Sequence, residues 1–141
     1  MEILFNAEQI EMPAIDHERI SRWINRVIVD AGCETGEINY VFCSDDYILE
    51  INRQYLKHDY FTDIITFDYV QGDTISGDLL ISVDTVRDNA TSYKVSFQEE
   101  LHRVMVHGVL HLLGINDKTD DQQEIMTQKE NESLVLLSNI H

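Results

Sequence analysis

Apolar side chains along this chain switch repeatedly between the 3.6-residue spacing of a helix and the two-residue spacing of a strand. Helical spacing is clearest in the stripe formed by Ile20, Trp23, Ile24, Val27 and Ile28. Strand alternation is clearest at Ile38, Tyr40 and Phe42. No repeat, low-complexity tract or linker divides the sequence. The spacing predicts a single α+β domain over residues 1–141, with about five helices packed on a small mixed sheet of about four strands.

The strongest strand prediction is a hairpin. It pairs IITFDYV (64–70) with DLLISVD (78–84) through the turn QGDTISG (71–77). Residues 2–6 predict a further short strand at the edge of the sheet. The strands are therefore expected early and in the middle of the chain, with a long helical stretch after them.

Helix boundaries are predicted from capping residues. Asp16 starts the first helix and Gly32 ends it, Ser44 caps a second helix, and Asp84 caps a third that runs toward Lys94. A capping box starts each of the last two helices: Ser96 with Glu99 in the first, and Thr119 with Gln122 in the second. In the second helix, the residues spaced to share one side are Ile48, Leu49, Asn52 and Tyr55. The final helix is indicated by the apolar positions Ile125, Met126, Leu134 and Leu137.

The charge of the chain limits its partners. Ten Lys and Arg face 26 Asp and Glu, a formal net charge of −16, which opposes nonspecific attraction to nucleic acid or to an anionic membrane. Any nucleic-acid role must therefore be local, at a metal cation and a few basic side chains. No apolar run approaches the roughly 18 residues that cross a bilayer, and neither end resembles a signal peptide, so a cytoplasmic location is expected.

The sequence HGVLHLLGIND (107–117) carries the candidate chemistry. On a helix, His107 and His111 lie one turn apart on the same face and can direct two imidazoles to one point. Gly114 lets the chain leave the helix and turn back, which brings Asp117 within reach as a third ligand. Three protein ligands leave an open position, as in catalytic zinc sites. Zinc is favoured, with iron, manganese and nickel left open, and the metal cleft is expected at the end of this helix.

Gly108 separates this motif from the metzincin peptidases, whose ligand spacing it otherwise matches. Those enzymes carry a catalytic glutamate directly after the first histidine, and a glycine cannot accept a proton, so peptidase activity is disfavoured. Two interpretations of Gly108 stand equally: it gives a polymer backbone close access to the metal, or it allows tight helix packing. By contrast, His102 lies about 140° around the helix from His107 and is not expected to be a ligand.

Three ordered blocks resemble the YbeY family of single-domain bacterial endoribonucleases linked to ribosomal RNA maturation. The first block holds His107, Gly108, Leu110, His111, Leu112 and Gly114. The second holds Asn52, Tyr55, Asp59, Thr62, Asp63 and Phe67, and the third holds Gly77 and Asp78. Met126 and Glu130 follow downstream, so the resemblance covers roughly residues 38–134.

Two departures from the family pattern concern the site. The third ligand of the family is usually histidine, and here that position is Asp117. The family arginine credited with handling the RNA phosphate is Leu56 here, so Lys57 or Arg53 is expected to take its place. Asp63 either orients a ligand histidine or closes a turn.

The resemblance implies a zinc-dependent endoribonuclease that acts on single-stranded ribosomal RNA near the small ribosomal subunit, and no membrane partner is expected. A metal in such a site can polarise a phosphoryl oxygen and activate water, with Lys57 or Arg53 countering charge in the transition state. Tyr55, Tyr60 and Phe61 are either base-stacking residues or ordinary core and loop aromatics. The alternatives are a metal-binding ribosome accessory protein that does not cut RNA, and a metallopeptidase.

Overall fold

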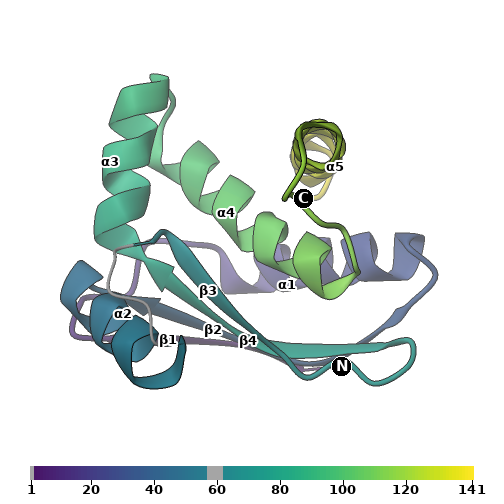
Figure 1. Cartoon of the computed structure of the whole chain (residues 1–141). Coiled ribbons are helices and arrows are strands. Elements are labelled where there is room, and N and C mark those ends of the chain that lie inside the picture. The colour runs from purple at the N-terminus through teal and green to yellow at the C-terminus, as the bar shows by residue number, and fades with distance from the viewer. Residues whose placement is uncertain (1, 57–61) are drawn as a thin grey trace.

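The computed structural model describes residues 2–56 and 62–141, and Figure 1 shows the path of the chain. Its strands are β1 (Glu2–Glu8), β2 (Glu34–Cys43), β3 (Ile64–Asp68) and β4 (Thr74–Ser82). Its helices are α1 (His17–Asp30), α2 (Asp45–Ile51), the π-helical turn η1 (Asn52–Leu56), α3 (Val83–Tyr93), α4 (Phe97–Leu112) and α5 (Asp120–Ser138). The predicted α+β class, with five α-helices and four strands in one mixed sheet, is confirmed over the described residues.

The sheet has the order β1-β2-β4-β3. The first three strands in that order are parallel, and β3 pairs antiparallel with β4 at the opposite edge from β1. The predicted hairpin is therefore confirmed, although its turn is shorter than expected, because β4 already begins at Thr74. Gln71 and Thr74 pair across the turn, and Gly72 adopts a positive φ of 59° there.

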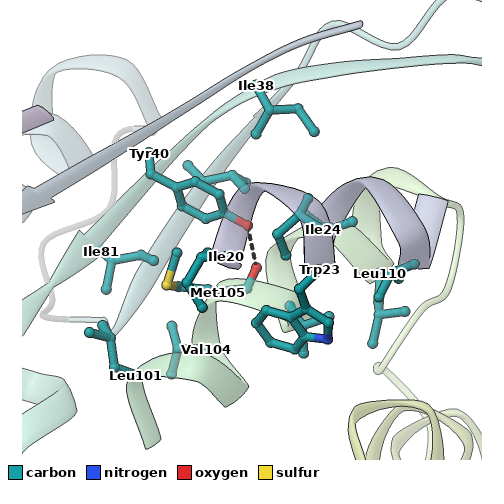
Figure 2. Close-up of a cluster of buried hydrophobic side chains, with 14 of the residues drawn as sticks. Ile20, Trp23, Ile24, Ile38, Tyr40, Ile81, Leu101, Val104, Met105 and Leu110 are labelled. Atoms are coloured by element: carbon teal, nitrogen blue, oxygen red, sulfur yellow. Dashed lines mark hydrogen bonds between the residues drawn. The ribbon is translucent and has the colours of Figure 1, made fainter. Parts of the chain in front are cut away.

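One face of the sheet is covered by α1 and α4, and α2 packs on the opposite face (Figure 1). The main core lies between the sheet and α1 with α4, and all five predicted α1 residues are buried in it. Two buried aromatic side chains in this core make hydrogen bonds to backbone carbonyl groups of helices. The Tyr40 hydroxyl donates to the Met105 carbonyl oxygen at 2.9 Å, as Figure 2 shows, and Trp23 Nε1 donates to the Ser133 carbonyl oxygen at 2.7 Å. Buried Tyr and Trp need such partners, and here the partners hold α4 and α5 in place.

The opposite face carries a smaller cluster of Cys43, Ile48, Ile65 and Leu80 beneath α2. Ser44 caps α2 as predicted, accepting from the backbone N–H of Tyr47 at 3.1 Å. Ile48 is buried in this cluster, whereas the Tyr55 side chain is 65% exposed. After Ile51 the helix widens into the π-helical turn η1, which changes the face on which later side chains emerge.

Helix boundaries agree with the capping residues in most places. Thr119 and Gln122 form the complete predicted capping box of α5, and Ser96 accepts from the backbone N–H of Glu99 at the start of α4. The predicted cap of α3 is wrong, because Ser82 caps that helix and Asp84 lies in its first turn.

The predicted final helix is α5, and its buried row is partly polar. Ile125 is 50% exposed, and the buried positions are Met126, Glu130, Ser133 and Leu137. Two of the four buried residues are polar, so apolar spacing alone does not identify the side of α5 that faces the core. Across residues 2–56 and 62–141, no helix combines the length and apolar character needed to span a membrane.

Candidate metal centre

The C-terminal part of α4 positions the two histidines, and the helix end brings the aspartate to them. His107 and His111 lie one turn apart near the end of α4. Beyond Leu112, Gly114 takes a φ of 95°, and the backbone N–H of Ile115 donates to the Leu110 carbonyl oxygen at 3.0 Å. This closure by a left-handed residue reverses the chain. Asp117 is thereby carried back to the histidines.

The three side chains converge on one point. The Nε2 atoms of His107 and His111 lie 3.0 Å apart, and Asp117 Oδ2 lies 3.4 Å from the first and 3.3 Å from the second. Ligand atoms about 2.0–2.1 Å from a tetrahedral ion are themselves roughly 3.3 Å apart. The observed spacings therefore fit a small divalent metal ion. All three side chains are partly exposed, which leaves the ion open to solvent on one side.

Glu130 of α5 contacts the ring nitrogen of His107 that faces away from His111 and Asp117. Its Oε2 lies 2.6 Å from His107 Nδ1, and because an ionised carboxylate only accepts, Nδ1–H is the donor. This leaves Nε2, the atom that faces His111 and Asp117, free to bind a metal. Arg103 Nη1 donates to the other carboxylate oxygen at 2.9 Å, and Arg103 Nη2 donates to Asn131 at 2.8 Å. Three residues on two helices thus fix the orientation of one ligand.

Burial and charge act against each other at this centre. Burial alone would lower the pKa of His107, but the hydrogen bond and charge of Glu130, with Asp117 and Asp63, outweigh it and raise the pKa. Burial raises the pKa of Asp63, and the nearby His107 opposes that rise. Burial likewise raises the pKa of Glu100, against the attraction of Arg103. The carboxylates of Glu130, Asp117 and Asp63 therefore all act on His107, which suits a cation beside it.

Comparison with known proteins shows the family of the chain. The profile of the family described as Endoribonuclease YbeY matches residues 4–138. A protein named Endoribonuclease YbeY from Parabacteroides distasonis is 56% identical over 97% of this chain and 96% of its own length. The chain belongs to the YbeY endoribonuclease family. A Flavobacterium psychrophilum protein of the same name is 50% identical over 95% of each chain.

A solved structure supports the fold. The solution structure of TM1509 from Thermotoga maritima superimposes with a TM-score of 0.69, covering 96% of this chain and 88% of that one, at 23% sequence identity. The two proteins therefore share the fold although few of their residues are identical.

The structure places the other predicted site residues as follows. Arg53 is exposed on η1, and Lys57 lies outside the described residues, as do Tyr60 and Phe61. Asp63 is partly buried directly before β3, close enough to His107 for their charges to interact. The acceptor for His107 Nδ1 is nevertheless Glu130, so Asp63 does not orient this nitrogen.

The orienting role of Glu130 was missed from the sequence. The sequence did contain a signal for it. Glu130 follows the apolar Met126 by four residues, so the two lie on the same side of α5, and a charged residue on a buried side usually has a specific partner.

Gly108 is explained by packing. It is buried, and a Cβ at this position would lie 2.8 Å from Ile64 Cδ1 and 2.9 Å from Leu79 Cδ2. The glycine therefore lets α4 approach β3 and β4 closely, and the interpretation that it opens the metal to a polymer backbone is wrong. A glutamate here would have to displace both side chains, which removes the structural basis for a metzincin-like peptidase. His102 packs edge-on against Trp23, with centroids 5.9 Å apart, and is not part of the histidine-aspartate group.

Proposed function

We propose that this chain is a metal-dependent endoribonuclease that cuts single-stranded ribosomal RNA during ribosome maturation. Membership of the YbeY endoribonuclease family supports an RNA-cutting hydrolase. The proposal extends this to the cytoplasm, to the small ribosomal subunit as the place of action, and to residues 1–141 as one functional domain. The single observation that carries the proposal is the convergence of His107, His111 and Asp117 at spacings that suit a metal ion.

The proposed ligands are His107 Nε2, His111 Nε2 and one carboxylate oxygen of Asp117. Zinc is the proposed metal, because two imidazoles and one carboxylate with an open position form a common catalytic zinc set. When bound, the ion supplies a Lewis acid for a phosphoryl oxygen and makes a water molecule more acidic. The carboxylate lowers the positive charge of the site relative to three neutral histidines, so the water is expected to be less acidic than in a three-histidine site.

The remaining residues act around these ligands. Glu130 and Arg103 keep His107 in the tautomer that presents Nε2. Asp63 stays a predicted catalytic residue because it lies partly buried beside His107. Arg53 and Lys57 stay predicted phosphate contacts, since they flank the position at which this chain has Leu56 in place of the family arginine. Each supplies a positive charge near the segment that leads into β3.

Metal analysis of the purified protein tests the ligand set. We expect about one ion per chain in the parent, and loss of that ion and of RNA cleavage in His111→Ala and in Asp117→Ala. His102→Gln is the matched control, because this histidine lies on the same helix and outside the converging group. Full metal content in Asp117→Ala would show that the ligand assignment is wrong.

A second candidate is an accessory protein that binds the ribosome through this site without cutting RNA. Two observations favour it: Leu56 stands where the family has its arginine, and Asp117 stands where the family usually has histidine. Multiple turnover of an unpaired ribosomal RNA fragment by pure protein, abolished in His107→Ala, would exclude this candidate. RNA binding by the metal-loaded protein without any cleavage product would exclude the nuclease.

A further inference from the structure

A groove on the α2 face of the sheet has no role in the chemistry described above. It is lined by Ile51, Tyr55, Phe67, Tyr69, Asp78 and Leu80, and we call it the aromatic groove. The groove encloses about 240 Å³. Pockets for drug-sized ligands are typically about 300–1,000 Å³, so the aromatic groove suits a single small planar group.

The sheet register explains why these side chains meet. Phe67 of β3 is paired with Asp78 of β4, and Ile65 is paired with Leu80 two residues further along. Alternate residues share a face, so Phe67, Asp78 and Leu80 point toward α2. Ile64 and Leu79 point the other way, toward Gly108 of α4. The groove and the metal centre therefore lie on opposite faces of the same hairpin.

The walls of the groove are aromatic and accessible. Tyr55 meets Phe67 edge-on, with ring centroids 6.3 Å apart and an interplanar angle of 88°. Tyr55 is 65% exposed and Tyr69 is 57% exposed. Exposed aromatic faces beside the partly buried Phe67 form a stacking platform, and stacking of an unpaired base on an aromatic side chain contributes about 1–3 kcal/mol. Tyr55 lines this groove instead of packing in the core, so its exposed ring is available to a ligand.

Asp78 supplies the polar contact in the groove. Its Oδ1 accepts a hydrogen bond from Asn39 Nδ2 at 2.9 Å, and within residues 2–56 and 62–141 Oδ2 has no hydrogen-bond donor. A carboxylate only accepts, so its best partner is a base edge that presents two adjacent donors. Guanine presents N1–H and the N2 amino group side by side. Adenine and cytosine place an acceptor nitrogen beside their amino group, and uracil flanks its single N–H with two carbonyls, so each would turn an acceptor toward the carboxylate.

We propose that the aromatic groove is a guanine-binding subsite for single-stranded RNA. The inference rests on the proposed function, because it assigns a base preference to the same substrate. The net charge of −16 means that phosphate attraction cannot supply much affinity, so base contacts must. Asp63 next to His107 and Phe67 in the groove are four residues apart on one extended segment, or about 13 Å along the strand. An RNA strand crossing edge strand β3 reaches both sites within a few nucleotides.

Equilibrium binding to metal-free protein tests the subsite without cleavage. Fluorescence anisotropy would compare three short labelled single-stranded RNAs that are identical except for one central guanosine, inosine or adenosine. We expect the guanosine RNA to bind about tenfold more tightly than the adenosine RNA, with inosine between them because it lacks the N2 amino group. Asp78→Asn is expected to remove the preference, because its amide replaces one acceptor oxygen with a donor.

Variants of the walls separate stacking from hydrogen bonding. Tyr55→Ala is expected to weaken binding of all three RNAs about tenfold, which matches the stacking contribution. Tyr93→Ala is the matched control, because Tyr93 is also 65% exposed and lies outside the groove, and it should bind like the parent. Circular dichroism and thermal unfolding confirm that each variant is folded.

Several outcomes would overturn the proposal. Equal affinity for the three RNAs would do so, and so would a preference that survives in Asp78→Asn. A third is tight, Asp78-dependent binding of an arginine-rich peptide with no base preference, which would assign the groove to a basic protein partner. Because the assay is metal-free, a guanine preference without any cleavage by the metal-loaded protein would remove the proposed function and leave the subsite standing as an RNA-binding site.

Discussion

Replacing Glu130 should weaken metal binding although Glu130 is not a ligand. The Glu130 side chain is only 10% exposed, and it accepts from His107 Nδ1 at 2.6 Å and from Arg103 at 2.9 Å. Losing such a partner of a ligand histidine typically costs about 10–100-fold in metal affinity, or about 1.4–2.7 kcal/mol. Glu130→Gln keeps one acceptor oxygen, which can still accept from His107, but it loses the charge and the contact to Arg103, so about tenfold is expected. Glu130→Ala loses both, so the loss should approach 100-fold.

A competition titration against a coloured chelator measures this effect, with Co²⁺ as a second probe because its absorbance reports the coordination geometry. Glu132→Gln is the matched control, since Glu132 lies on the same helix but its side chain is 55% exposed. Urea unfolding of the metal-free variants shows that they remain folded. We expect Glu130→Ala to lose about 1–3 kcal/mol of unfolding free energy, because Arg103 loses its carboxylate partner.

The affinity measurement is decisive. If Glu130→Ala bound the metal as tightly as the parent while remaining folded, Glu130 would not be orienting His107. An equal loss of affinity in Glu132→Gln would mean that general negative charge, and not the contact to Nδ1, attracts the ion.

Three further predictions concern the scaffold. Gly108→Glu should lower the unfolding free energy by about 1–3 kcal/mol in urea titration, because its side chain must displace Ile64 and Leu79, which outweighs the roughly 1 kcal/mol of helix propensity gained, and unchanged stability would contradict the tight helix-sheet contact. Trp23→Phe should cost about 1–3 kcal/mol, because it removes the buried hydrogen bond to the Ser133 carbonyl oxygen and part of the packed indole ring, and a melting temperature equal to that of the parent would contradict this. Burial raises the pKa of Glu100 above its unfolded value, so the parent loses stability as pH rises through the folded pKa. Glu100→Gln should therefore be more stable than the parent at neutral pH and lose that advantage below the unfolded pKa, as thermal unfolding across pH would show, and a pH-independent difference would contradict it.

Local periodicity carried the predictions that succeeded. The α1 stripe from Ile20 to Ile28 and the alternation of Ile38, Tyr40 and Phe42 are buried as expected, because a helix or strand presents one face whatever lies opposite. The same spacing did not distinguish buried from exposed side chains at Tyr55 and Ile125. Both have suitable spacing, but η1 changes the helix geometry before the first, and the second lies just outside the face that α5 turns to the core.

The sequence by itself determined the shape of the candidate metal centre. His107 and His111 are brought together by one helical turn, and Gly114 returns Asp117 to them, so the convergence depends on backbone geometry within eleven residues. Only the tertiary structure decided what surrounds that centre. Glu130 reaches His107 from 23 positions away, and Gly108 faces the sheet instead of the substrate. Such contacts depend on how helices pack against one another and on the sheet, which no local spacing encodes.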